Sequence, residues 1–165
     1  MKTFKQKPIT VLGKTLAVGD QAPDFFAINR GLETKHLKDF DQKYVILNVV
    51  PSLDTSVCSL QTRTINERLA AFSNALVLTI SNDLPFAQAR YCGAEGLDNI
   101  ITLSDHRDLD FAMKYGVLIQ ELRLLARSVF VLDENRKVIY VDYLDEMTLH
   151  PNYDQLFAFL DSTIQ

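Results

Sequence analysis

The chain contains two cysteines, Cys58 and Cys92, and they are its residues with the most distinctive chemistry. A cysteine thiolate is a nucleophile that can be oxidised reversibly, and a second thiol can then close a disulfide with it. Two cysteines are too few for the disulfide framework of a small secreted protein. They suffice for one redox pair, so the next question is which elements position them.

The residues around Cys58 predict that it lies in the first turn of a helix that follows a buried strand. The run 44–50 is apolar and β-branched almost throughout, which is typical of a central strand buried on both faces. Pro51 ends this strand, residues 52–56 include several N-cap types, and apolar side chains recur at helical spacing over 57–72. The unpaired backbone N–H groups and the partial positive charge at a helix start both favour a thiolate.

Each residue of this segment also has a purely structural interpretation. Free cysteines are among the most buried residues, so Cys58 could be a small apolar side chain in a core helix. Thr55 could be a plain helix N-cap and Pro51 a strand terminator. The capped first turn favours a nucleophile, because a free cysteine with a pKa near 8.5 is only about 3% thiolate at pH 7 and gains from any stabilisation of the anion.

Strands and helices alternate along the rest of the chain. The start Asn82-Asp83-Leu84-Pro85 predicts a helix with Asn82 or Asp83 as its cap and Pro85 in its first turn, and this helix should stop before Gly93. The remaining predicted elements are strands at 75–80, 100–103, 128–132 and 138–144 and helices at 109–115 and 152–164.

A β-hairpin is predicted in front of these elements. Residues 7–12 and 15–18 flank Gly13-Lys14, a plausible two-residue turn, so the hairpin occupies residues 1–18. The whole order is then a hairpin followed by β-α-β-α-β-α-β-β-α. This order predicts an α/β thioredoxin-like fold, with a mixed central sheet flanked by helices, in a single domain over residues 1–165.

The composition excludes several other classes of protein. Of the 165 residues, 47% are hydrophobic and 23% charged, which rules out intrinsic disorder. A formal net charge of −4 argues against binding to nucleic acid or to an anionic membrane. The chain has no apolar stretch long enough for a signal peptide or a membrane-spanning helix, so we expect a cytoplasmic protein whose thiols stay reduced at rest.

The segment around Cys58 resembles the active site of the peroxiredoxins, whose pattern is Pro-x-x-x-Thr/Ser-x-x-Cys. Pro51, Thr55 and Cys58 have these spacings. The resemblance is to the thiol peroxidase branch of the family, of the atypical 2-Cys type, and it covers nearly the whole chain. It includes the N-terminal hairpin and these further residues and segments: Gln61, Thr62, Arg63, Asn66, 18–25, 126–133 and 151–153.

The resemblance implies a role for each residue of the motif. Cys58 would be the peroxidatic cysteine, which attacks the O–O bond of a hydroperoxide and becomes a sulfenic acid. Thr55 would orient the peroxide and the thiolate through its hydroxyl, and Pro51 would shield the pocket from water. Arg127 matches the family's active-site arginine, whose guanidinium would stabilise the thiolate and the charge on the leaving oxygen.

The choice of arginine depends on the resemblance alone. By position in the sequence, Arg90 and Arg123 are competing candidates, and Arg127 could be a surface charge at the start of a strand. Only the match over residues 126–133 selects Arg127.

The resemblance also assigns Cys92 as the resolving cysteine, on a helix of the same chain. Cys92 would attack the Cys58 sulfenic acid and form an intramolecular disulfide, which thioredoxin would reduce. Without the resemblance, Cys92 is equally well a thiol with no redox role. Because a disulfide needs Cα atoms within about 7 Å, we expect residues 55–60 and 85–95 to unfold locally in each cycle.

The sequence predicts no cofactor. It lacks a Gly-rich dinucleotide fingerprint, and His36, His106 and His150 are isolated rather than paired at metal-ligand spacings. The partners that the resemblance implies are a hydroperoxide substrate, thioredoxin as reductant, and a second copy of the chain in a homodimer.

Two other functions stay open at this point. A thioredoxin-like disulfide oxidoreductase usually carries C-x-x-C at the helix start and a proline before the third core strand, whereas here Cys58 is followed by Ser-Leu-Gln and Arg127 precedes the strand. A peroxide-sensing module on the same fold could retain all of these residues. The apolar segment 117–125 lacks the Gly/Pro character common in the branch, and it could border the substrate pocket.

Overall fold

The computed structural model of the chain describes residues 1–164. A 3-10 helix covers Leu37–Asp39, and the strands and α-helices are β1 (Thr3–Phe4), β2 (Lys7–Pro8), β3 (Val11–Leu12), β4 (Phe26–Ile28), β5 (Thr34–His36), β6 (Tyr44–Val49), α1 (Ser56–Leu69), β7 (Ala75–Ser81), α2 (Pro85–Ala94), β8 (Ile101–Ser104), α3 (Asp110–Tyr115), β9 (Leu118–Ile119), β10 (Leu124–Leu125), β11 (Ser128–Leu132), β12 (Val138–Tyr143) and α4 (Tyr153–Thr163).

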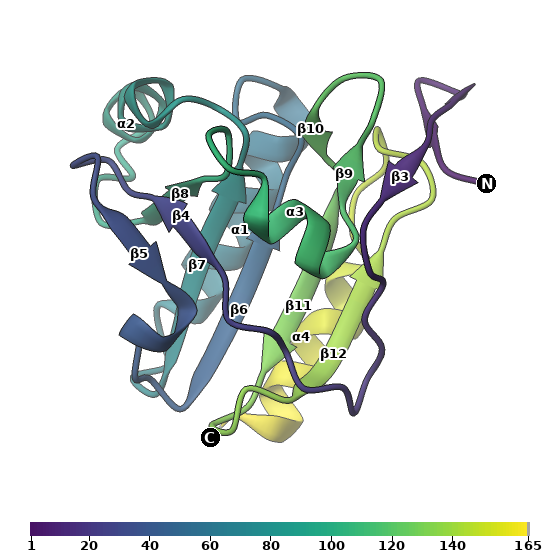
Figure 1. Cartoon of the computed structure of the whole chain (residues 1–165). Coiled ribbons are helices and arrows are strands. Elements are labelled where there is room, and N and C mark those ends of the chain that lie inside the picture. Colours follow the sequence, from purple (N-terminus) through teal and green to yellow (C-terminus); the bar gives the residue numbers. More distant parts are fainter. Residues whose placement is uncertain (165) are drawn as a thin grey trace.

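The central sheet has seven strands in the order β12-β11-β6-β7-β8-β4-β5 (Figure 1). β6, β7 and β8 run parallel to one another, and antiparallel strands extend the sheet on both sides. A helix follows each parallel strand, because parallel neighbours need a crossover connection. The predicted alternation of strands and helices, with the hairpin β11–β12 before the last helix, is confirmed.

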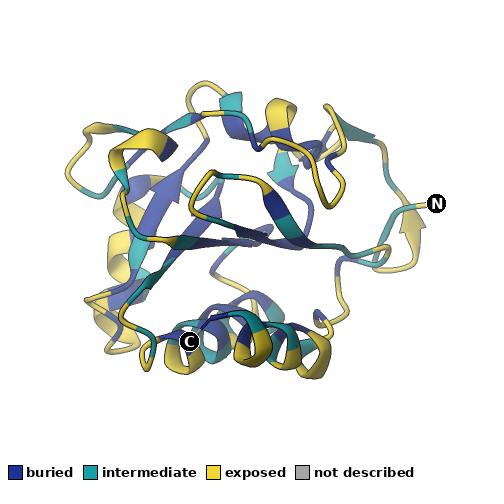
Figure 2. Ribbon diagram, turned by 90° about the horizontal axis from the view of Figure 1, so that it is seen from below, coloured by how far each residue is buried: buried dark blue, intermediate teal, exposed yellow. Residues whose placement is uncertain are grey.

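Helices cover both faces of this sheet. In Figure 1, α1 and α4 lie behind the sheet, where Ile65 of α1 packs with Ile46 of β6 in one apolar cluster. On the front, Phe111 of α3 and Phe25 of the N-terminal segment share a second cluster with Leu47 of β6. Viewed from below, the strands of the central sheet are coloured largely as buried, and the helices carry exposed residues on their outer sides (Figure 2). Ile46 and Leu47, which are neighbours in β6, are therefore buried on opposite faces of the sheet, as predicted for a central strand.

The helices of residues 1–164 are all too short or too polar to span a lipid bilayer.

A hairpin forms at the N-terminus, but its predicted turn at Gly13-Lys14 is wrong. β1 and β2 pair around Lys5 and Gln6, which both have positive φ angles (51° and 64°), as a tight hairpin turn requires. β3 does not pair with residues 15–18 but with β9. A Cβ on Gly13 would lie 2.6 Å from the carbonyl oxygen of Met113, so Gly13 allows the chain to pass close to the end of α3 rather than to turn back in a hairpin.

α2 ends later than predicted. It continues through Gly93 to Ala94, and the left-handed residue that follows is Gly96, with a φ of 69°. A glycine in an exposed helix costs only about 0.5–1 kcal/mol, so Gly93 does not terminate it. Cys92 therefore lies within the helix rather than at its end.

The start of α2 also differs from the prediction. Pro85 occupies the first turn as expected, but the N-cap is Leu84, which makes no side-chain cap hydrogen bond. The predicted capping by Asn82 or Asp83 is wrong, because the Asp83 carboxylate accepts hydrogen bonds from the Ser52 hydroxyl and the Leu53 backbone N–H instead.

Asp105 is a buried carboxylate at the start of α3. It is 1% exposed, and it accepts hydrogen bonds from the backbone N–H groups of Phe111 at 3.1 Å and Ala112 at 2.9 Å. Burial raises the pKa of Asp105 from 3.8 to about 7, although the two backbone hydrogen bonds act in the opposite direction.

Asp105 is expected to make the stability of the protein depend on pH. Because the folded pKa is raised, the folded state holds the proton more tightly than the unfolded chain does. The stabilisation by this group is therefore complete below about pH 4 and is lost as the pH rises towards 7, a change on the order of 2–4 kcal/mol in the free energy of unfolding. Urea unfolding at pH 5 and pH 8 should show a smaller loss for Asp105→Asn than for the wild type. Equal losses would contradict the assignment.

Candidate active site

The structure places Cys58 in the first turn of α1. Thr55 is the N-cap, with extended backbone angles, and Cys58 is the third helical residue. The Cys58 side chain is 1% exposed and packs with Val50 and Leu53 in a small cluster at the end of β6. The backbone N–H of Cys58 is one of the helix-terminal donors that lack an intrahelical acceptor, so the positive end of the helix lies at the sulfur.

Arg127 contacts Cys58 because of the register between β6 and β11. β11 is antiparallel to β6, with Ser128 opposite Val49, so the residue before β11 lies beside the segment that follows β6. Nη2 of Arg127 donates to Sγ of Cys58 at 3.2 Å. A guanidinium at this distance stabilises a thiolate and can also contact an oxygen that is bound to the sulfur.

Burial separates the three candidate arginines. Arg127 is 2% exposed, whereas Arg90 and Arg123 lie on the surface. A buried cation requires partners, and Arg127 has them on every side of its guanidinium. Nε donates to the carbonyl oxygen of Met147 at 2.9 Å, and Nη1 donates to Oε1 of Gln61 at 2.9 Å.

Gln61 and, through it, Asn48 hold Arg127 in place, and neither was predicted as a site residue. Gln61 lies one turn after Cys58 on α1, and its Nε2 donates to Oδ1 of Asn48 at 2.7 Å. Asn48 in turn donates to the hydroxyls of Thr62 and Thr79. The signal for Asn48 was present, because it is a polar residue inside the apolar run 44–50.

Pro51 and Thr55 belong to the segment that joins β6 to α1, which we call the Cys58 loop (residues 50–55). Pro51 is buried two residues after the end of β6. Thr55 is exposed, and its hydroxyl donates to the carbonyl oxygen of Ser52 at 3.1 Å. This hydroxyl makes no cap hydrogen bond, so Thr55 is the N-cap by position only.

Tyr153, the first residue of α4, is a further neighbour of the site. Burial raises the pKa of Tyr153 to about 12, Arg127 lowers it and Cys58 raises it. The phenol is therefore protonated at neutral pH and can act as a hydrogen-bond donor. Tyr153 belongs to the segment 151–153 of the resemblance, but nothing in the sequence pattern indicates that α4 starts next to Cys58.

Cys92 is fully buried on α2 and does not share a cluster with Cys58. It is 0% exposed and packs with Leu97 and Ile100, and both cysteines are free thiols. Burial is the largest cause that raises the pKa of Cys92, so this thiol is protonated at neutral pH while it stays buried. Tyr91 packs against both cysteine clusters.

Two polar contacts join the helices that carry the cysteines. The hydroxyls of Tyr91 and Ser59 lie 2.9 Å apart, next to Cys92 and Cys58 in the sequence. Further along, Arg63 of α1 forms an ion pair with Glu95 at 2.8 Å. These contacts join α1 to the end of α2, while the two cysteines lie in separate clusters.

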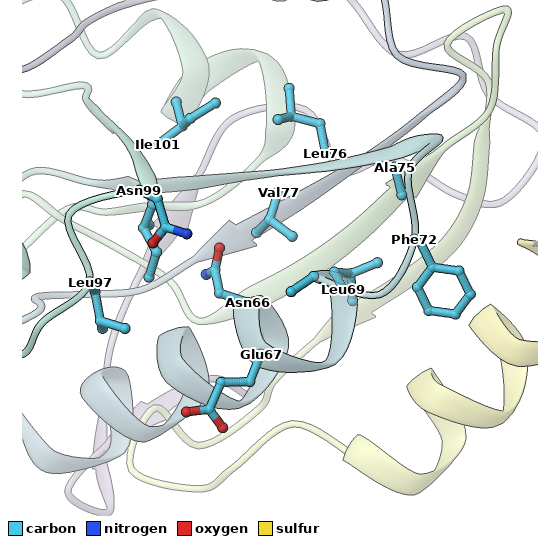
Figure 3. Close-up of a pocket in the computed structure, with 12 residues that line it drawn as sticks. Asn66, Glu67, Leu69, Phe72, Ala75, Leu76, Val77, Leu97, Asn99 and Ile101 are labelled. Atoms are coloured by element: carbon cyan, nitrogen blue, oxygen red, sulfur yellow. The ribbon is translucent and has the colours of Figure 1, made fainter.

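Two cavities lie near these helices. One, of about 350 Å³, lies between the C-terminal half of α1, β7 and the segment before β8, and is lined by Asn66, Leu69, Phe72, Val77 and others (Figure 3). It lies at the far end of α1 from Cys58, although Leu97 and Ile100 also line it. The other, of about 340 Å³, lies between the Cys58 loop and α2.

The chain is similar to a known protein family and to curated proteins over nearly its whole length. The Redoxin family matches residues 17–157. The thiol peroxidase of Bacillus subtilis (strain 168) is 57% identical over 153 residues, which cover 93% of this chain and 92% of that protein. The thiol peroxidase of Streptococcus pneumoniae (strain ATCC BAA-255 / R6) is 52% identical over 158 residues, which cover 96% and 97%.

Solved structures show the same likeness. The peroxiredoxin-like protein from Aquifex aeolicus has a TM-score of 0.90 at 37% identity and covers 99% of this chain and 96% of its own. The thiol peroxidase from Chromobacterium violaceum has a TM-score of 0.88 at 23% identity, a likeness of fold, and covers 98% and 95%.

The chain therefore belongs to the redoxin family. The predicted thioredoxin-like fold is confirmed, and so is the predicted thiol peroxidase branch of the peroxiredoxins. Its activity class is that of a thiol-dependent peroxidase.

Proposed function

We propose that this chain reduces hydrogen peroxide and organic hydroperoxides through a Cys58 sulfenic acid and a Cys58–Cys92 disulfide, which thioredoxin reduces. The observation that carries the proposal is the 3.2 Å contact between Arg127 and the Cys58 sulfur at the start of α1. The thiol peroxidase relatives support the class of substrate. We propose further that residues 1–165 form one domain, which acts as a homodimer in the cytoplasm.

In the first step, the Cys58 thiolate attacks one oxygen of the peroxide. The S–O bond forms as the O–O bond breaks, and the sulfur loses two electrons to become a sulfenic acid. The second oxygen leaves as hydroxide or alkoxide and takes up a proton to give water or an alcohol. Arg127 stabilises the charge on this leaving oxygen, Thr55 orients the peroxide, and Pro51 keeps water away.

In the second step, the Cys92 sulfur attacks the Cys58 sulfur. The S–S bond forms, and the sulfenic oxygen leaves as water with the proton that Cys92 releases. We expect the fold to open for this step, because both cysteines are buried in separate clusters and the contacts Tyr91–Ser59 and Arg63–Glu95 join their helices. Exposure also removes the burial that raises the pKa of Cys92, which makes this thiol a better nucleophile.

In the third step, the two thiols of reduced thioredoxin return two electrons and two protons to the disulfide. An NADPH-linked assay with thioredoxin and thioredoxin reductase tests the whole cycle, with hydrogen peroxide and an organic hydroperoxide in parallel. We expect NADPH consumption to require this protein, thioredoxin and peroxide together. Consumption no faster than in the control without this protein, for both peroxides, would overturn the proposal.

Replacement of the resolving cysteine separates the first step from the second. Cys92→Ser should reduce thioredoxin-linked turnover to the background of the assay, because no thiol of the chain can then form the disulfide. The same variant should still consume one equivalent of peroxide and gain the mass of an oxidised Cys58. Thioredoxin-linked turnover at the wild-type rate would exclude Cys92 as the resolving residue.

A further inference from the structure

Asp83 connects the Cys58 loop to the elements that carry Cys92. It lies between β7 and α2, and its carboxylate is an acceptor for three donors. Oδ1 accepts the hydroxyl of Ser52 at 2.7 Å, and Oδ2 accepts the backbone N–H of Leu53 at 2.8 Å and the hydroxyl of Ser81 at 2.7 Å. Two of these three donors belong to the Cys58 loop.

The carboxylate is used outside the helix that it precedes. An aspartate at this position was expected to cap α2, but the N-cap is Leu84 and makes no side-chain cap hydrogen bond. A carboxylate that does not cap its helix can accept hydrogen bonds from another segment and stabilise that segment. Here it stabilises the loop that precedes Cys58.

The loop contacts of Asp83 lead directly to Thr55. Ser52 accepts the backbone N–H of Asp54 at 3.2 Å through its hydroxyl oxygen, and its carbonyl oxygen accepts the hydroxyl of Thr55 at 3.1 Å. Leu53 is buried in the same cluster as Cys58. The position of the Thr55 hydroxyl therefore depends on a residue that Asp83 fixes.

On its other side, Asp83 is linked to α2. The Ser81 hydroxyl oxygen accepts Nε2 of Gln88 at 3.0 Å, and Gln88 is fully buried. Gln88 lies four residues before Cys92, so both side chains are on the same face of the helix. The carbonyl oxygen of Asp83 also accepts the hydroxyl of Ser104 at 2.5 Å.

We propose that Asp83 is a positioning residue, which holds the Cys58 loop in the form that reacts with peroxide and ties it to the helix of Cys92. This inference rests on the disulfide step of the proposed function. Asp83 acts in opposite directions on the two chemical steps. Its contacts promote the oxidation of Cys58, and they must part before Cys92 can reach the oxidised sulfur.

The test compares Asp83→Ala and Asp83→Asn with the wild type, without thioredoxin. One equivalent of hydrogen peroxide is mixed with reduced protein, the reaction is quenched by a thiol-alkylating reagent at set times, and intact masses distinguish thiol, sulfenic acid and disulfide. Asp83→Ala should slow the oxidation of Cys58 on the order of tenfold, because several hydrogen bonds to a charged group are lost. The same variant should convert sulfenic acid to disulfide several-fold faster than the wild type. Asp83→Asn keeps one acceptor oxygen and should lie between the two.

Asp108→Ala is the matched control. Asp108 is an exposed aspartate in the segment between β8 and α3, and its carboxylate contacts Arg107. This variant should match the wild type in both steps.

The inference is overturned if Asp83→Ala oxidises at the wild-type rate, or if it forms the disulfide more slowly than the wild type, as a generally distorted site would. Circular dichroism and thermal melting show whether each variant folds, and Asp83→Asn decides the question if the alanine variant does not. A wild-type protein that forms a sulfenic acid but no disulfide would instead refute the proposed function.

Discussion

Cys58→Ser is expected to abolish peroxide reduction while the fold stays intact. The serine hydroxyl is neutral at pH 7 and cannot replace the thiolate as the group that attacks the O–O bond. Loss of the nucleophile in other enzymes lowers the rate on the order of 10⁶-fold, so we expect no turnover above the uncatalysed reaction. The NADPH-linked assay with thioredoxin measures turnover, and direct peroxide consumption measures the first step alone.

The folded state should tolerate this change because serine is close to cysteine in size. Arg127 also keeps its contacts with Met147 and Gln61 when the sulfur is absent. The melting temperature of Cys58→Ser should therefore stay near that of the wild type, which separates a chemical defect from unfolding. Peroxide consumption by folded Cys58→Ser at the wild-type rate would refute the mechanism.

Local patterns predicted the elements that carry the site, because these patterns depend on neighbours in the sequence. The apolar run 44–50 and the helical spacing after Val57 place Cys58 at a helix start, as the structure has it. The left-handed Gly116 that ends α3 was predictable for the same reason. Gly13 was misread, since the reason for this glycine is the backbone of α3, which lies far away in the sequence.

Residues whose partners come from distant elements could not be predicted in this way. Gln61 belongs to the sequence resemblance that follows Cys58, but its bond to Arg127 depends on the register between β6 and β11. Asp83 has the sequence position of a helix cap, and only the folded chain shows its carboxylate on Ser52 and Leu53. The helix-capping preference of aspartate predicts a hydrogen bond to α2, whereas the tertiary fold decides which other donors lie close enough to bind its carboxylate.

Arg127→Lys is expected to slow the oxidation of Cys58 severely, although the positive charge is retained. The guanidinium of Arg127 donates at once to the Cys58 sulfur, to Gln61 and to Met147. A lysine ammonium is a compact point charge, so it cannot reproduce this planar set of donors. Loss of one preorganised donor to a developing anion costs about 10²–10³-fold in rate, and we expect the rate constant for Cys58 oxidation to fall by this amount.

Arg123→Lys is the matched control, because Arg123 lies on the surface and competed with Arg127 in the sequence. It should oxidise at the wild-type rate in the same quenched reaction with one equivalent of peroxide. The replacement Gln61→Leu makes a further distinction, since it leaves Arg127 in place but removes the oxygen that Nη1 binds. If Gln61 orients the guanidinium, Gln61→Leu should oxidise more slowly than the wild type but faster than Arg127→Lys. If the role of Arg127 were purely electrostatic, Arg127→Lys would retain most of the wild-type rate, and this result would contradict the prediction.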